Sequence, residues 1–146
     1  MDLIHRLQLV QNCPARLVLC GRKYEHITPL LKELHWLPVE QRIVFKILLL
    51  TFKALHNLSP SYIRDLLQTY KPVRSLRSSA MNMLVIPRSG LKFYGDRAFS
   101  VCAPKLWNNL PEHIKCSSNL RTFTKSLKTH FLSAILIYSF VLLFST

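Results

Sequence analysis

The sequence predicts a mostly α-helical fold, an irregular helical module that ends in one long C-terminal helix. Apolar residues recur every three or four positions along most of the chain, and prolines stand where such stretches begin. At most one short segment, at about 81–93, has the pattern of a small β-hairpin. Because the chain has 146 residues, of which 49% are hydrophobic and 18% charged, it can bury one modest core.

The first predicted helix covers residues 3–19 and has one apolar face, which we expect to be buried. Polar residues such as Gln8 fill the opposite side. Asp2 is expected to cap the helix start, and Gly21 to end the helix. Because a proline lacks the backbone N–H and clashes with the preceding turn, we expect the helix to kink or break at Pro14. The residues of the apolar face are Leu3, Leu7, Val10 and Leu17.

Three further helices are predicted between residues 28 and 68. Thr28 is expected to cap the first of them, with Pro29 at its first position, and Pro38 opens the second. The second helix is apolar around most of its circumference, so we expect it to pack on several sides as the centre of the core. The expected ranges of the three helices are 29–36, 38–56 and 60–68.

Helical periodicity is lost after residue 70. Residues 71–96 are predicted to form a basic loop and the small hairpin, because turn formers and arginines replace the apolar repeat. One or two helical turns should follow, kept short by Pro104 and Pro111. The residues of these turns that we expect to be buried are Ala98, Val101 and Trp107.

The last predicted helix covers residues 119–143 and has two faces. We expect the basic face to be an ordinary solvated surface. The apolar face consists of Leu120, Phe123, Leu127 and Phe131. The basic face consists of Arg121, Lys125 and Lys128.

The uncharged, apolar tail at 132–146 raises the alternative of a small membrane-associated protein. A helix over 131–146 would be about 24 Å long, against a hydrocarbon core of roughly 30 Å, and Lys128 could extend its side chain to the interface. The tail would then be a membrane segment, preceded by a helical region at 1–131. Localisation stays open on this basis: membrane if the tail inserts, and nucleus or cytoplasm if the protein is soluble.

The charge is strongly positive and unevenly distributed. The formal net charge is +13 and the pI is about 10.1, a balance that favours polyanionic partners. Between Lys71 and Lys128 there are eleven basic residues against Asp96 and Glu112, a net charge of 11 − 2 = +9. Any contact with a polyanion, either a nucleic acid or an anionic membrane surface, is therefore expected mainly in the second half of the chain.

No constellation of residues in the sequence predicts catalysis. The chain has three glycines and no phosphate-binding loop, its aspartates are scattered, and its histidines are not clustered. The four cysteines form no zinc-binding spacing. We therefore expect no metal, no cofactor and no small-molecule substrate. Because Asp2 and Arg6 interrupt the N-terminal apolar stretch, no signal peptide is predicted, and the cysteines are expected to be free thiols.

Several motifs along the chain carry a family resemblance. In order they are "LQLVQNCPARLV", "HITPLLKELHWLPVEQRIVFKILLLTFKAL", "LSPSYIRDLL", "RSLRSS", "VIPRSGLKFYGDRAFSVCAPKLWNNLPEHIK" and "FTKSLKTHF". Together they resemble the C-terminal end of the reverse transcriptase open reading frame of LINE-type (non-LTR) retrotransposons. The resemblance extends from about Leu7 to Phe131, and its most specific parts are "LHWLPV", followed by "RI" and "FK", and "GDRAFS", followed by "APKLWN" and "LP".

The resemblance implies a non-catalytic piece of an RNA-directed DNA polymerase. The segment would follow the polymerase palm, in or after the thumb, and it contains neither the Tyr-x-Asp-Asp palm motif nor the endonuclease of the family. Cys13 and Pro14 stand where the family has small, helix-compatible residues, and the family ends soon after the position of Phe131. Both departures favour a degenerate, truncated copy, and an inert pseudogene product is a further alternative.

The function that the resemblance implies is accessory: a basic helical module that holds template RNA or target DNA. Lysine and arginine side chains would neutralise phosphates without reading sequence. A surface that is merely solvated is the equally weighted alternative. Phe93, Tyr94 and Trp107 could stack on bases, although we expect each to belong to the core. The predicted nucleic-acid-binding residues are Arg74, Arg77, Arg88, Lys92, Arg97 and Lys105.

Overall fold

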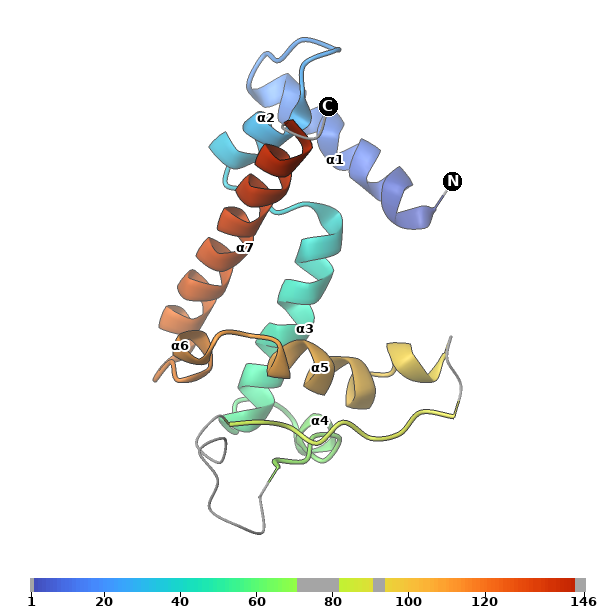
Figure 1. The fold of residues 1–146 in the computed structure, drawn as a ribbon, viewed down its shortest axis with the longest axis vertical. Coiled ribbons are helices and arrows are strands. Elements are labelled where there is room, and N and C mark those ends of the chain that lie inside the picture. Colours follow the sequence, from blue (N-terminus) through green and yellow to red (C-terminus); the bar gives the residue numbers. More distant parts are fainter. Residues whose placement is uncertain (1, 71–81, 91–93, 144–146) are drawn as a thin grey trace. The chain divides into compact units, whose positions relative to one another are not determined.

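The computed structural model describes residues 2–70, 82–90 and 94–143, with side chains up to residue 134 in the last helix. The described chain is mostly helical, as predicted, and Figure 1 shows the course of its elements. In order they are α1 (Leu3–Val18), α2 (Ile27–Glu33), α3 (Val39–Leu55), α4 (Ser61–Arg64), the 3-10 turn η2 (Gly95–Arg97), α5 (Phe99–Asn108), α6 (Glu112–Lys115) and α7 (Leu120–Leu143).

The chain divides into two compact units. Unit 1 consists of Met1–Phe45 and Lys125–Thr146, and unit 2 of Lys46–Thr124. Unit 1 therefore contains α1, α2 and most of α7, and unit 2 contains most of α3 and the elements from α4 to α6.

Unit 1 is organised around the corner between α2 and α3, where Pro38 interrupts helical hydrogen bonding. Side-chain amides of α1 replace the missing backbone partners at this corner. Gln11 Nε2 donates a hydrogen bond of 2.9 Å to the Leu37 carbonyl, and the Val39 N–H donates one of 2.9 Å to Gln8 Oε1. Gln8 Nε2 donates in turn to Asn12 Oδ1, at 2.8 Å. Two glutamines thus hold the corner from both sides of its proline.

The orientation predicted for α1 is wrong. Gln11, Asn12 and Ala15 are its buried residues, whereas Val10 is 69% exposed. The other members of the predicted apolar face, which are Leu3, Leu7 and Leu17, are exposed as well. The physical reason is the corner: its backbone groups need hydrogen-bond partners when they are buried, and the amide face of α1 supplies them.

Pro14 does not break α1, which runs without interruption from Leu3 to Val18. The proline lies on the exposed side of the helix. The carbonyl that loses its helical partner is that of Val10, four residues earlier, and this residue is exposed too. Water can solvate that carbonyl, which makes the proline tolerable at this position.

Three helices end in the same way, with a residue other than glycine in the left-handed conformation. Cys20, His35 and Asn57 have φ values of 51°, 52° and 58°. In each case the next residue donates its N–H to the carbonyl five positions back, as in the bond of 2.8 Å from Trp36 to Leu31. Cys20 therefore takes the position expected for Gly21. At the other end, α2 begins at Ile27 without a side-chain cap, so the prediction that Thr28 caps it is wrong.

Three aromatic residues form the centre of unit 2. The Phe52 and Phe123 rings stack with their centroids 4.2 Å apart, and Trp107 lies 6.0 Å from Phe123. All three side chains are fully buried. On α3, Leu48, Phe52 and Ala54 are buried, whereas Ile43 and Leu50 are exposed, so one part of its apolar circumference faces solvent.

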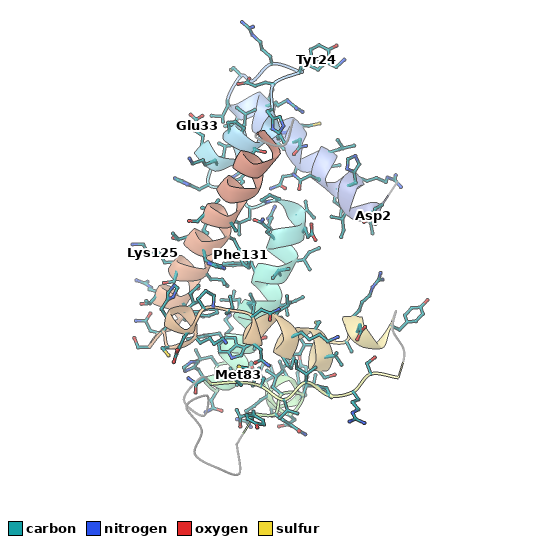
Figure 2. All side chains as sticks on the ribbon, in the orientation of Figure 1. Asp2, Tyr24, Glu33, Met83, Lys125 and Phe131 are labelled. Carbon is teal, nitrogen blue, oxygen red and sulfur yellow. The ribbon has the colours of Figure 1, made fainter. Side chains whose placement is uncertain are left out.

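The segment at 82–85 is held both by α5 and by residues 68–70. Two backbone hydrogen bonds join it to residues 68–70, from the Tyr70 N–H to the Met83 carbonyl at 2.9 Å and from the Val85 N–H to the Gln68 carbonyl at 2.8 Å. Asn108 on α5 donates from Nδ2 to the Leu84 carbonyl and accepts from the Leu84 N–H at Oδ1, both at 2.9 Å. Leu84 also forms an isolated antiparallel bridge with Thr69. Within 82–90 the structure has no hairpin, and 91–93 lie outside the described residues. Figure 2 labels Met83 on this segment.

Helix α5 is longer than predicted and α6 was not predicted at all. Pro104 lies inside α5, which continues to Asn108. Val101 and Trp107 are buried as expected, but Ala98 is exposed because it precedes the helix and lies in the turn after η2. The four-residue α4 is shorter than the predicted 60–68.

The range and the faces of α7 match the prediction closely. The helix begins at Leu120, and Phe123 and Leu127 on its apolar face are fully buried. The side chains of 135–146, which form most of the apolar tail, lie outside the described part. Within the described residues, no helix combines the length and the apolar character needed to cross a membrane.

Alanine substitutions at two adjacent positions of α1 test its orientation. Gln11→Ala should lower the free energy of unfolding by about 1–2 kcal/mol, because the buried Leu37 carbonyl loses its donor. Val10→Ala should change it by less than about 0.5 kcal/mol, because the side chain is exposed. Urea denaturation of both variants measures the difference. If Val10→Ala is the more destabilising change, α1 buries its apolar face after all.

Candidate nucleic-acid interface

Three of the six predicted nucleic-acid-binding residues fall in the described part of the structure. All three are exposed: Arg88 follows the segment at 82–85, Arg97 lies in η2 and Lys105 in α5. All three belong to unit 2. The other three, which are Arg74, Arg77 and Lys92, lie outside the described residues.

Lys105 differs from the other two because it has an acidic partner. Its ammonium lies 2.9 Å from Asp96 Oδ1, and both side chains are nearly half exposed. An exposed ion pair of this kind stabilises a protein little, but it does lower the positive potential at Lys105. Arg97, another predicted binding residue, is the neighbour of Asp96 in the sequence. The acidic group therefore weakens this part of the predicted surface.

The three aromatic candidates for base stacking divide between core and surface. Trp107 is 1% exposed and donates from Nε1 to the Asn82 carbonyl at 2.9 Å, so it belongs to the core, as expected. Tyr94 is 81% exposed, which contradicts the expectation that it is buried. It immediately precedes η2. Phe93 lies outside the described residues.

A second group of cations was missed by the sequence-based prediction. Lys32 on α2 and Lys125 and Lys128 on α7 line one open groove of about 690 Å³ in unit 1. Pro29 and Leu132 contribute apolar surface to it, and Glu33 is the one carboxylate among its described lining residues. Figure 2 labels Glu33 on α2 and Lys125 on α7. The spacing of Lys125 and Lys128 was visible in the sequence, but nothing there placed Lys32 beside them.

Burial alters the acidity of two groups in unit 2. Burial is the main cause that lowers the pKa of the Lys115 ammonium below 10.5, because the charged form is poorly solvated. Burial also raises the pKa of the Cys102 thiol above 9.0, mainly because the thiolate would lose water. Cys13, Cys20 and Cys116 are exposed, and all four cysteines are free thiols.

Among the described residues, no three histidine, cysteine, aspartate or glutamate side chains converge as metal ligands would. Comparison of the chain with protein-family models, with curated proteins and with solved structures gave no significant match.

Removal of the Asp96 carboxylate tests whether this surface binds a polyanion. Asp96→Asn should tighten binding of a single-stranded oligonucleotide by about two- to threefold, the size expected for one exposed charge. Fluorescence anisotropy at low salt measures this change. Asp2→Asn removes the same charge at the N-terminus and is the matched control. An equal gain in both variants would show that net charge acts without a local surface.

The buried ammonium of Lys115 should make stability depend on pH in the alkaline range. Between its lowered pKa and 10.5, the unfolded chain binds more protons than the folded chain, so a rise in pH favours folding. The free energy of unfolding of the parent should therefore rise relative to that of Lys115→Met across this window. Urea denaturation in pH steps measures the difference. If the free energy of unfolding of the parent falls relative to that of Lys115→Met as pH rises, the fold stabilises the charged form of Lys115.

Proposed function

We propose that this chain is a non-catalytic fragment related to the C-terminal end of LINE-type reverse transcriptases, and that it binds single-stranded RNA or DNA weakly and without sequence preference. The predicted nucleic-acid-binding residues, called here the basic surface, would hold a strand by its phosphates. The chemistry of strand synthesis would belong to a palm domain, whose Tyr-x-Asp-Asp motif does not occur in these 146 residues.

One observation carries the proposal, which is the number of cations left without an acidic partner. The chain has 20 lysines and arginines against 7 aspartates and glutamates. Within the described residues, the pair between Lys105 and Asp96 is the one ion pair that forms. Cations without a counter-charge are available to phosphates, and the counterions released from the nucleic acid favour binding.

The positions of the exposed cations support the same proposal. Arg88 and Arg97 lie exposed in unit 2, and Tyr94, beside Arg97 in the chain, offers an exposed ring to an unstacked base. Lys125 and Lys128 are exposed on α7. Contacts of this kind are sequence-tolerant, because every nucleotide presents a phosphate and an aromatic face.

The salt dependence of binding tests this proposal. The affinity of the parent for a fluorescent oligonucleotide should fall steeply as salt rises, with a slope of about −0.7 in log K against log salt for each phosphate contact. Arg88→Ala with Arg97→Ala should flatten the slope by up to about 1.4, because two contacts are lost. Substitution of Arg74, Arg77, Arg88 and Lys92 together should flatten it by up to about 2.8. Fluorescence anisotropy over a salt series gives each slope.

A double variant that removes two exposed charges from the first half of the chain is the control. Arg6→Ala with Arg42→Ala should leave the slope nearly unchanged, because both side chains lie outside the proposed surface. Equal slopes for the two double variants would contradict a localised surface. A parent that binds no oligonucleotide at low salt would contradict the function itself and favour an inert product.

A further inference from the structure

Unit 2 contains a cavity of about 450 Å³ that the basic surface described above does not include. Its volume lies within the range of small-molecule sites, roughly 300–1,000 Å³. Its walls come from the end of α3, from the Thr69–Leu84 bridge, from α5 and from the connection between α6 and α7. No carboxylate is found among the described residues that line it. The lining residues that matter for its chemistry are His56, Thr69, Tyr70, Lys115 and Ser118.

Lys115 is an unusual residue to find in the wall of such a cavity. It is only 7% exposed, yet it forms no ion pair within the described part of the chain. Its ammonium has three N–H donors, and one of them reaches the Asn108 carbonyl at 2.9 Å. That bond explains part of its position, since a cation is favourable at the C-terminal end of α5. The charge has no ion-pair partner among the described residues, and the nearby Glu112 carboxylate only partly offsets the cost of burying it.

The start of α7 adds a second source of positive potential. Ser117 and Ser118 line the cavity and precede Asn119, which caps this 24-residue helix by accepting from the Thr122 N–H at Oδ1, at 2.8 Å. The N-terminal end of a helix carries a partial positive charge, which favours anions. Ser117 uses its hydroxyl internally, in a bond of 2.8 Å to the Ile114 carbonyl. Ser118 is exposed, so its hydroxyl can serve a ligand.

We propose that this cavity, named here the Lys115 cavity, binds a phosphate monoester, and that its ligand is the terminal 5′-phosphate of a nucleic acid strand. A dianionic phosphate would supply the direct ion-pair partner that Lys115 lacks among the described residues. Its oxygens accept from the ammonium and from the hydroxyls of Ser118 and Thr69. Tyr70, half exposed at the rim, offers a ring to the attached base. A free mononucleotide shares this chemistry.

The inference rests on the proposed function for the delivery of its ligand, because the basic surface would hold the strand whose end enters the cavity. It adds a contact that an internal phosphate cannot make. An internal phosphodiester carries one charge and two chain connections, whereas a terminal phosphate carries up to two charges and one connection. The Lys115 cavity should therefore distinguish a phosphorylated strand end from a hydroxyl end.

Two oligonucleotides that differ only at the 5′ end test the inference. Full-length protein is titrated with a fluorescent ten-residue thymidine strand that carries either a 5′-phosphate or a 5′-hydroxyl. The phosphorylated strand should bind about tenfold more tightly, the order expected for a charge-assisted hydrogen bond. Equal affinity of the two strands for the parent would overturn the inference.

Substitutions should remove the preference without removing binding. Lys115→Met should bind both strands with the affinity that the parent shows for the hydroxyl strand, and Ser118→Ala should reduce the preference in part. Lys46→Met removes an exposed lysine of α3 outside the cavity and should keep the full preference. A preference that survives in a folded Lys115→Met protein would overturn the inference.

Chemical labelling of the parent gives an answer that does not depend on the folding of a variant. Lysines are acetylated in the presence of each strand or of thymidine 5′-monophosphate, and the modified lysines are read by mass spectrometry. Lys115 should be protected by the phosphorylated strand and by the mononucleotide, but not by the hydroxyl strand. Protection by the mononucleotide while neither strand binds would support the cavity and contradict the proposed function. Strands that bind without protecting Lys115 would support the proposed function and contradict the Lys115 cavity as a phosphate site.

Discussion

The corner between α2 and α3 is held by two glutamine side chains, and the arrangement of unit 1 depends on that contact. Gln8 and Gln11 bind the backbone on either side of Pro38, where a proline and a left-handed histidine leave peptide groups without helical partners. A peptide group buried without a partner costs as much as a lost hydrogen bond, so the amide face of α1 must turn inward. The apolar face of α1 is exposed as a direct result.

This contact also explains what could and could not be predicted from the sequence. Elements whose apolar pattern agrees with their surroundings were predicted well: α3 and α7 begin within one residue of their predicted starts, and Phe123 and Leu127 are buried as their spacing indicates. The orientation of α1 was not, because periodicity counts apolar side chains and ignores the backbone of a corner about 26 residues away. The same limitation applies to Leu84, whose backbone binds the side chain of Asn108 and whose bridge partner is Thr69 rather than a strand within 81–93.

The positive charge of the candidate surface could be predicted from the sequence, but the contacts of its individual side chains could not. Composition gives a polyanion partner and a merely solvated basic face equal weight, and Arg88 and Arg97 are exposed. The pairing of Lys105 with Asp96, the grouping of Lys32 with two lysines of α7, and the burial of Lys115 all depend on contacts between separate segments. Charge counts treat these lysines as equivalent, although burial makes one of them a different chemical group from the others.

The left-handed helix ends have a consequence for which substitutions the chain can accept. Cys20, His35 and Asn57 each adopt a conformation that costs an ordinary L-residue on the order of 1 kcal/mol, less for asparagine. Glycine would relieve this cost at Cys20 and His35, whereas valine or isoleucine would add a clash between the branched side chain and the backbone. Sequence drift at these three positions is therefore restricted by backbone geometry alone, although none of them lies in the core.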